Sequence, residues 1–270
     1  MKQYYPVLTI AGSDCSGGAG IQADLKTMSA LGVYGMSAIT AITAQNTTGV
    51  TSIQGVSPDM VADQIDMIYS DIKPLAVKTG MLYNKKIIEV VADRLMYHGV
   101  KNLVIDPVMM STSGSKLIDD DAIEVLIERL FPLATLITPN KHEVIRLTGS
   151  DNLQKQANYL RKMGIKNFII KGGDSSRADV KIDYLGVSTN SQLIRLRSKA
   201  IETVNTHGTG CTLSSAIASY LALGLNLETS VKHAKRYITR AISAGKDVSI
   251  GNGHGPVNHF FAPKRIEISE

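Results

Sequence analysis

Short apolar segments rich in β-branched residues alternate along the chain with segments of helical periodicity, and this alternation constrains the fold more than any other feature. Continuous apolar strands separated by helices predict an α/β fold, in which a mostly parallel central sheet is covered by helices on both faces. Strands are expected at 7–12, 37–45, 75–80, 102–109, 134–140 and 167–173, and helices at 18–32, 57–72, 84–99, 119–130 and 151–164.

The last third of the chain adds different elements. Residues 182–198 alternate about a polar turn and predict a β-hairpin at one edge of the sheet. A glycine-rich turn at 207–211 leads into an apolar helix, and residues 228–245 predict an amphipathic helix. The basic residues of this amphipathic helix are expected to face solvent; they are Lys232, Lys235, Arg236 and Arg240.

Length and composition favour a single domain over residues 1–270. With 44% hydrophobic residues the chain has enough apolar side chains for a sizeable core, and no Pro/Gly/Ser-rich linker interrupts the pattern. The net charge of +5 is spread over helices that also carry Asp and Glu, which disfavours nucleic-acid binding and favours a small anionic ligand. The use of only two cysteines, and the absence of an apolar run long enough for a signal peptide or a membrane span, favour a reduced, cytoplasmic protein.

Polar or glycine-rich residues follow nearly every predicted strand. In an open α/β sheet, ligands bind at the carboxyl ends of the strands. These residues therefore predict a binding site at that edge of the sheet; they are 12–14, 45–46, 78–80, 106–107, 139–140 and 171–173.

The glycine-rich loop at 11–25 is a weaker signal. Its glycines match neither the dinucleotide pattern G-x-G-x-x-G nor the phosphate loop G-x-x-x-x-G-K-[ST]. Asp24 falls within the first turns of the helix that follows, and two roles stay open for it. It is either a charge that stabilises the start of the helix or a side chain that points back at the mouth of the loop.

The turn at 207–211, with the sequence HGTGC, is the stronger candidate for an anion site. It stands directly before a helix, whose unpaired N–H groups and positive dipole end attract anions. Gly208 and Gly210 let the backbone approach a phosphate closely, and Thr209 and Cys211 are placed to face a transferred group. A simple tight turn is the alternative.

Two carboxylates and a lysine are expected beside this turn. Asp106 ends one apolar strand, Glu143 follows the end of another, and Lys171 ends a third. The carboxylates predict a Mg²⁺ and phosphate site in which the metal is held largely through water, and Lys171 is either a positive charge beside phosphates or a solvated side chain. The spacing of Cys and His residues does not favour zinc.

These motifs occur together and in one order. With AGSDCSGGAGIQADLKT, TAITAQNT, KTGML, VIDPVM, ITPNKHE, IIKGG and NTHGTGC, the chain resembles the hydroxymethylpyrimidine/phosphomethylpyrimidine kinases of thiamine biosynthesis, which belong to the ribokinase superfamily. The resemblance implies a ribokinase-like three-layer sandwich, usually dimeric. It also implies ATP- and Mg²⁺-dependent phosphorylation of 4-amino-5-hydroxymethyl-2-methylpyrimidine and then of its monophosphate.

The resemblance assigns roles to individual residues. It places the pyrimidine pocket at Gly12, Asp24, Gln45, Met81 and Val108, the anion hole at 208–211, and the ATP, metal and phosphate contacts at Asp106, Asn140, Glu143 and Lys171. Asn140 and Glu143 match the N-x-x-E feature of the superfamily. The amide of Gln45 suits its place, because it offers one donor and one acceptor to an aminopyrimidine edge.

Cys211 stands where most sugar kinases of the superfamily have a catalytic aspartate. A thiol at the start of a helix beside cations is expected to have a lowered pKa and to serve as a weak base. The second acceptor is a phosphate, which is already anionic and needs no base. Positioning and charge neutralisation then carry most of that step.

Two alternative functions stay open. Pyridoxal kinase has the same fold, but the segment 106–116 lacks the cysteine that follows this strand in dual-function relatives. A ligand-binding protein without catalytic activity is the second alternative, which the presence of Asp106, Glu143 and Lys171 disfavours. Residues 110–118 are rich in Ser and Gly and are expected to form a mobile lid.

Overall fold

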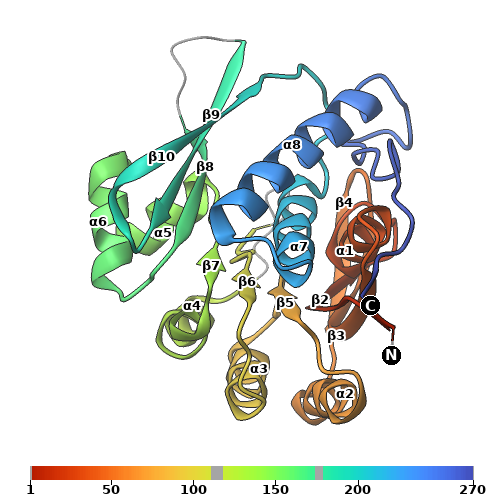
Figure 1. Ribbon diagram of the computed structural model, residues 1–270, viewed down its shortest axis with the longest axis vertical. Coiled ribbons are helices and arrows are strands. Elements are labelled where there is room, and N and C mark those ends of the chain that lie inside the picture. Colours follow the sequence, from red (N-terminus) through yellow and green to blue (C-terminus); the bar gives the residue numbers. More distant parts are fainter. Residues whose placement is uncertain (1, 111–117, 174–178, 270) are drawn as a thin grey trace.

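The computed structural model describes residues 2–110, 118–173 and 179–269. A nine-stranded sheet runs through its centre (Figure 1). The strands are β2 (Pro6–Asp14), β3 (Tyr34–Asn46), β4 (Gly49–Gly55), β5 (Ala76–Thr79), β6 (Leu103–Ile105), β7 (Leu136–Ile137), β8 (Phe168–Gly173), β9 (Val180–Val187) and β10 (Asn190–Lys199). Their order across the sheet is β10-β9-β8-β7-β6-β5-β2-β3-β4.

The central part of the sheet is parallel. Every neighbouring pair from β8 to β3 runs parallel, whereas β4 pairs antiparallel with β3. At the opposite edge β9 and β10 form an antiparallel hairpin, which β9 joins to β8. The predictions of a mostly parallel sheet and of an edge hairpin are confirmed.

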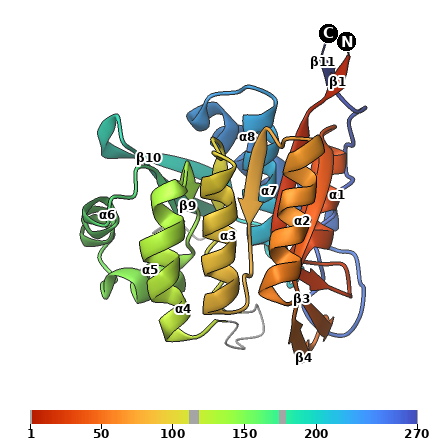
Figure 2. The same cartoon turned by 90° about the horizontal axis from the view of Figure 1, so that it is seen from below.

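Helices cover both faces of the sheet and complete a three-layer sandwich (Figures 1 and 2). One layer consists of α1 (Gly20–Ala30), α7 (Thr209–Ala222) and α8 (Leu227–Gly245). The other consists of α2 (Pro58–Asp71), α3 (Lys85–Tyr97), α4 (Asp120–Val125), α5 (Lys141–Thr148) and α6 (Leu153–Lys162). Each layer has its own apolar cluster against the sheet, so the central strands are buried on both sides.

Local sequence signals explain several of these helices. Ser57 caps α2, because its Oγ accepts a hydrogen bond from the N–H of Met60, and Pro58 takes the first helical position. Val61 and Ile65 then face the core, as the helical spacing predicts. In α8 the residues at helical spacing are likewise buried; they are Val231, Ala234, Ile238 and Ala241.

Three parts of the fold differ from the sequence-based expectation. The helix expected at 119–130 is α4 followed by a π-helical segment, Leu126–Leu130, and a 3₁₀ turn at Phe131–Leu133, where Pro132 cannot continue a helical hydrogen-bond pattern. The short helix α5 and the polar edge strand β4 were not predicted. Nor was the two-stranded pair β1 (Gln3–Tyr4) and β11 (Ile268–Ser269), which joins the two ends of the chain (Figure 2).

Two further expectations concern features outside the core. The lid expected at 110–118 falls largely on 111–117, which lie outside the described residues. Among the described residues, no helix has the length and apolar character that a membrane crossing requires.

Candidate active site

A cavity of about 780 Å³ lies at the carboxyl ends of the parallel strands. Each of the six predicted strand-end groups contributes to its lining. The contributing residues include Gly12, Asp14, Gln45, Lys78, Asp106, Asn140 and Lys171, and the start of α7 adds 208–211. The strand-end rule therefore located this cavity from the sequence alone.

Residues 208–211, which we call the anion turn, form the middle of the cavity. Gly208 has a φ of 78° and lies against the backbone of Gly18, where an added Cβ would stand 1.9 Å from the carbonyl oxygen. A Cβ at Gly210 would stand 3.1 Å from Asp106 Oδ2 and 3.3 Å from Lys171 Nζ. The turn therefore tolerates only glycine at 208, and Gly210 brings the first turn of α7 next to a carboxylate and a lysine.

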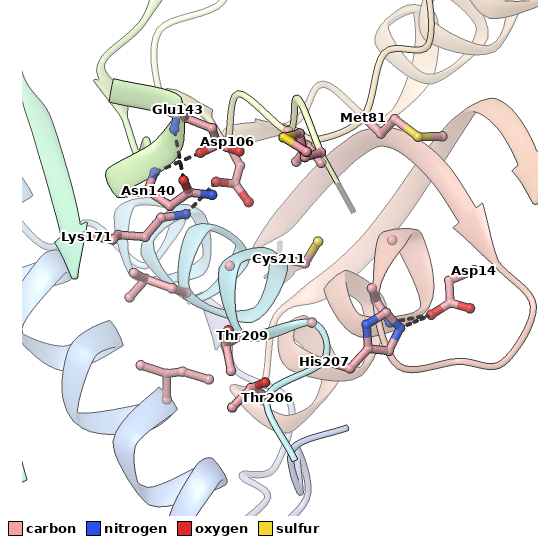
Figure 3. A pocket seen from close by; sticks show the side chains of 18 of the residues that line it. Asp14, Met81, Asp106, Asn140, Glu143, Lys171, Thr206, His207, Thr209 and Cys211 are labelled. Atoms are coloured by element: carbon pink, nitrogen blue, oxygen red, sulfur yellow. Dashed lines mark hydrogen bonds and ion pairs between the residues drawn. The ribbon is translucent and has the colours of Figure 1, made fainter. Parts of the chain in front are cut away.

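Asp106 and Lys171 form an ion pair at one end of the cavity (Figure 3). Lys171 Nζ lies 2.9 Å from Asp106 Oδ1, which also accepts a hydrogen bond of 2.9 Å from Thr138. Burial alone would lower the pKa of Lys171, but the carboxylates of Asp106 and Glu143 outweigh burial and raise it. Lys171 is thus a fixed cation, and the expectation that it is merely solvated is wrong.

Asn140 and Glu143 are joined by a capping box at the start of α5. The side chain of Asn140 accepts from the N–H of Glu143 at 3.0 Å, and Glu143 accepts from the N–H of Asn140 at 2.8 Å. The N-x-x-E feature therefore has a local structural cause, which turns the carboxylate of Glu143 back toward the strand ends. Burial raises the pKa of Glu143 to about 7; Lys171 opposes this rise and Asp106 adds to it.

The chemistry of this end fits a magnesium ion held through water. Within the described ranges, no three His, Cys, Asp or Glu side chains come together as a ready metal site. Asp106 and Glu143 instead supply two carboxylates that repel one another, and a divalent cation relieves such repulsion. Mg²⁺ keeps several water ligands and needs only one or two carboxylates, so these two residues are sufficient.

The opposite end of the cavity combines apolar side chains with one amide, next to a buried Asp–His pair. Gly12, Met81 and Val108 line it, and the N–H of Gly12 donates to the carbonyl oxygen of Met81 at 3.1 Å. Gln45 lies beside them, with its Oε1 3.2 Å from the hydroxyl of Thr43. An apolar surface with one amide matches a small, mostly neutral ring better than a phosphate.

Asp14 and His207 form a buried pair that the sequence analysis did not assign. His207 Nε2 lies 2.8 Å from Asp14 Oδ2 and 3.3 Å from the amide nitrogen of Gln45. Burial alone would raise the pKa of Asp14, but hydrogen bonds from His207, Ser16 and Ala19 hold it well below its usual range. The two residues were visible in the strand-end group and in HGTGC, but 193 positions separate them, so only the fold reveals the pairing.

Asp24 does not line the cavity, which corrects both roles left open for it and its place in the pyrimidine pocket. It is fully buried on the inner side of α1, where it forms an ion pair of 2.8 Å with Lys78. The hydroxyls of Thr9 and Ser215 also donate to it, at 2.6 and 2.5 Å. Lys78, not Asp24, borders the cavity.

Cys211 lies between the two ends of the cavity (Figure 3). Burial raises the pKa of its thiol to about 11, although Lys78 opposes this rise. The expectation of a thiol with a lowered pKa is therefore wrong, and Cys211 is protonated at neutral pH.

The expectation that Lys235 faces solvent is also wrong. Lys235 forms an ion pair with Asp183 and lines the cavity.

The three-layer sandwich, its carboxyl-edge cavity and the anion turn beside a carboxylate and lysine cluster define a ribokinase-like phosphotransferase. A model of the phosphomethylpyrimidine kinase family matches residues 14–258, and the chain belongs to this family.

Similar proteins support this assignment. The chain is 48% identical over 259 residues to a hydroxymethylpyrimidine/phosphomethylpyrimidine kinase of Rhizobium meliloti, with 94% of this chain and 96% of the relative covered. It is also 48% identical over 266 residues to a thiamine biosynthesis bifunctional protein of Geobacter sulfurreducens; this match covers 96% of the chain but 53% of the relative, so the chain spans about half of that protein. An ADP complex of Bacillus subtilis pyridoxal kinase has a TM-score of 0.84 and 36% identity, with 95% and 98% covered.

Proposed function

We propose that this chain transfers a phosphoryl group from ATP to 4-amino-5-hydroxymethyl-2-methylpyrimidine and then to the resulting monophosphate. One observation carries the proposal. A single cavity holds an end with Gln45 and apolar side chains beside the Asp14 and His207 pair, a carboxylate and lysine end at Asp106 and Lys171, and the anion turn between them. The acceptor, the transferred group and the donor nucleotide therefore each have a matching part of the same cavity.

Gln45 selects the pyrimidine ring. Its amide presents one donor and one acceptor, which complement the 4-amino group and the adjacent ring nitrogen. Met81 and Val108 provide apolar contact for the ring, and Gly12 leaves space beside them. A ring that lacks the matching edge would leave the amide of Gln45 unpaired in this desolvated pocket, so the enzyme discriminates strongly against such a ring.

The nucleotide phosphates lie at the opposite end. Lys171 neutralises phosphate charge, and Asp106 and Glu143 hold Mg²⁺ through water, where the ion supplies further neutralisation of the phosphates. Asn140 keeps Glu143 oriented through the capping box. An ADP complex of a structurally similar kinase supports nucleotide binding in this fold.

Transfer takes place over the anion turn. The N–H groups of 208–211 and the dipole of α7 stabilise the charge of the transferred group, which is the main task in phosphoryl transfer. Because the thiol of Cys211 is protonated at neutral pH, it is not a ready base for the alcohol. The monophosphate acceptor is already anionic, so its phosphorylation needs no base and depends on positioning and charge neutralisation.

Release of ADP from Mg-ATP, measured separately with the alcohol and with its monophosphate, tests the proposal. Turnover of both is the expected result, and release no faster than without an acceptor would contradict it. Pyridoxal belongs in the same experiment, because of the structural similarity to a pyridoxal kinase. A higher kcat/KM for pyridoxal than for the pyrimidine alcohol would replace the proposed acceptor with a pyridine.

The proposal extends to the form of the enzyme. We expect a single kinase domain over 1–270 that acts as a cytoplasmic homodimer, as the resemblance to this kinase group implies. Light scattering coupled to gel filtration measures the mass of the assembly, and a mass equal to that of one chain would contradict the dimer.

A further inference from the structure

Lys78 is a fully buried cation at the floor of the cavity. It stands near the end of β5, borders the cavity, and has none of its side chain exposed to solvent. Its ammonium lies beside Gly80, where an added Cβ would stand 2.7 Å from Nζ. In the sequence Lys78 belongs to a strand-end group, but no motif indicates its role.

The ammonium of Lys78 borders the same cavity as the anion turn and is linked to α7 through Asp24. Asp24 of α1 pairs with it, and Asp24 in turn accepts a hydrogen bond from Ser215 of α7. Ser215 follows Cys211 by four residues, which is one helical turn on the same face of α7. The Asp24 and Lys78 pair is therefore attached to the helix whose first turn forms the anion site.

The charge of Lys78 reaches the groups that surround the transferred phosphoryl group. Burial alone would lower its pKa, but the carboxylates of Asp24 from α1 and Asp106 after β6 raise it well above its usual value, and Cys211 from α7 adds to this rise only when its thiol is ionised. Lys78 thus stays protonated over the whole range in which the enzyme works. Among the described residues, the ammonium hydrogen-bonds to Asp24 alone, although it has three donors.

A structural role does not account for these features. A buried ion pair contributes little net stability, and apolar side chains of similar volume fill such a space equally well. A buried cation beside an anion site, by contrast, interacts with the anion through a low dielectric, and solvent does not screen this interaction.

We propose that Lys78 is a positioning residue of the phosphoryl-transfer site, whose buried ammonium supports the anion turn. The ammonium is the end of the Asp24 and Lys78 pair that borders the cavity, and there it adds to the partial charges of the α7 N–H groups and stabilises the transferred group in the transition state. The inference rests on the proposed kinase function and deepens it.

Two variants separate this role from a structural one. Asp24→Asn keeps the cation without its partner, and Asp24→Asn/Lys78→Met removes both charges and leaves no unpaired ion. We expect the double variant to have a kcat about 100-fold below that of Asp24→Asn with either pyrimidine acceptor, and a KM for ATP within about threefold of it. A kcat within about threefold of Asp24→Asn, with only the melting temperature changed, would overturn the proposal.

The pH profile gives a second readout. Without Asp24, the pKa of Lys78 falls, because burial is no longer offset by its main partner. The kcat of Asp24→Asn should therefore decline as the pH rises and the ammonium loses its proton, a decline that is absent from both the wild type and the double variant. Parallel profiles for Asp24→Asn and the double variant would contradict the role of Lys78.

A third readout does not depend on turnover. In a Cys15→Ser background Cys211 is the remaining thiol, and its alkylation by iodoacetamide reports its thiolate fraction. Removal of the cation raises the pKa of Cys211, so the double variant should react about tenfold more slowly than Asp24→Asn for each unit of that rise. Equal rates would contradict the charge contact. If the wild type released no ADP with either pyrimidine, the kinase proposal would fail, and this rate comparison would still test the proximity of Lys78 to the anion turn.

Discussion

Two of the Asp–Lys pairs, Asp24 with Lys78 and Asp106 with Lys171, differ mainly in access to solvent. The side chains of Lys78 and Asp24 are both 0% exposed, whereas those of Lys171 and Asp106 are 16% and 4% exposed and face the cavity. Their N–O distances, 2.8 and 2.9 Å, are nearly the same. Burial, rather than the N–O distance, therefore decides whether removal of one partner also destabilises the fold.

The largest expected effect tests the sealed pair. Lys78→Met leaves the carboxylate of Asp24 buried without a cation, and we expect the free energy of unfolding to fall by about 3–5 kcal/mol. Urea unfolding measures it. Asp24→Asn/Lys78→Met is the matched control and should recover most of the loss, because no charge stays unpaired. Equal losses in both variants would show that packing, not charge, is responsible.

The open pair should respond in the opposite way. Lys171→Met removes a cation from the phosphate end, and we expect kcat/KM to fall by about 10²–10³-fold, or roughly 2.7–4 kcal/mol. The free energy of unfolding should change by less than about 1 kcal/mol, because Asp106 keeps Thr138 as a partner and gains access to water. A stability loss as large as that of Lys78→Met would remove the distinction between the pairs.

Gln45 tests the end of the cavity that lies away from both Asp–Lys pairs. Gln45→Leu should cost about 2–4 kcal/mol in kcat/KM for the pyrimidine, because two hydrogen bonds are lost in a desolvated pocket. The KM for ATP and the melting temperature should change little. Asn46→Ala is the matched control, since Asn46 caps the following turn through Thr48 and Gly49. A similar loss in both variants would give Gln45 a loop-stabilising role instead.

The Asp14 and His207 pair, at 3% and 8% exposed, lies between the two extremes. The pKa of Asp14 is lower in the folded than in the unfolded state, so its contribution is present at neutral pH and is lost as the pH falls below about 4. Asp14→Asn should cost about 2 kcal/mol of unfolding free energy at pH 7 and progressively less in acid. A difference from the wild type that is independent of pH would show that the ionisation of Asp14 does not contribute.

The smallest effect is expected at Cys211, whose thiol interacts electrostatically with charges of both Asp–Lys pairs. Because its thiol is protonated at neutral pH, Cys211→Ala should lower kcat by less than about tenfold, or roughly 1.4 kcal/mol, and equally for the alcohol and the monophosphate. The turn N–H groups remain after the substitution. A loss confined to the alcohol would restore the role of a general base to Cys211.

Much of the fold followed from local sequence signals. Burial requires apolar side chains at a regular spacing. This spacing is visible in the apolar runs of β2, β5 and β6 and in the helical periodicity of α2 and α8. The short helix α5 was not predicted, because eight residues are too few to show a helical periodicity, although the Asn and Glu of its capping box are visible in the sequence. The polar strand β4 was not predicted, because an exposed edge strand needs no apolar face and so shows no apolar pattern in the sequence.

The candidate site also has features that could be predicted from the sequence and features that could not. The carboxyl-edge cavity, the anion turn, and the presence there of Asp106, Glu143 and Lys171 could be predicted, because the strand-end rule and the helix dipole depend on residues close together in the chain. Which charges pair with one another depends on the three-dimensional packing. The partner of Asp24 is 54 positions away and that of Asp14 is 193 positions away, so their burial, and with it the high pKa of the Cys211 thiol, depends on how α1, α7 and the sheet pack together.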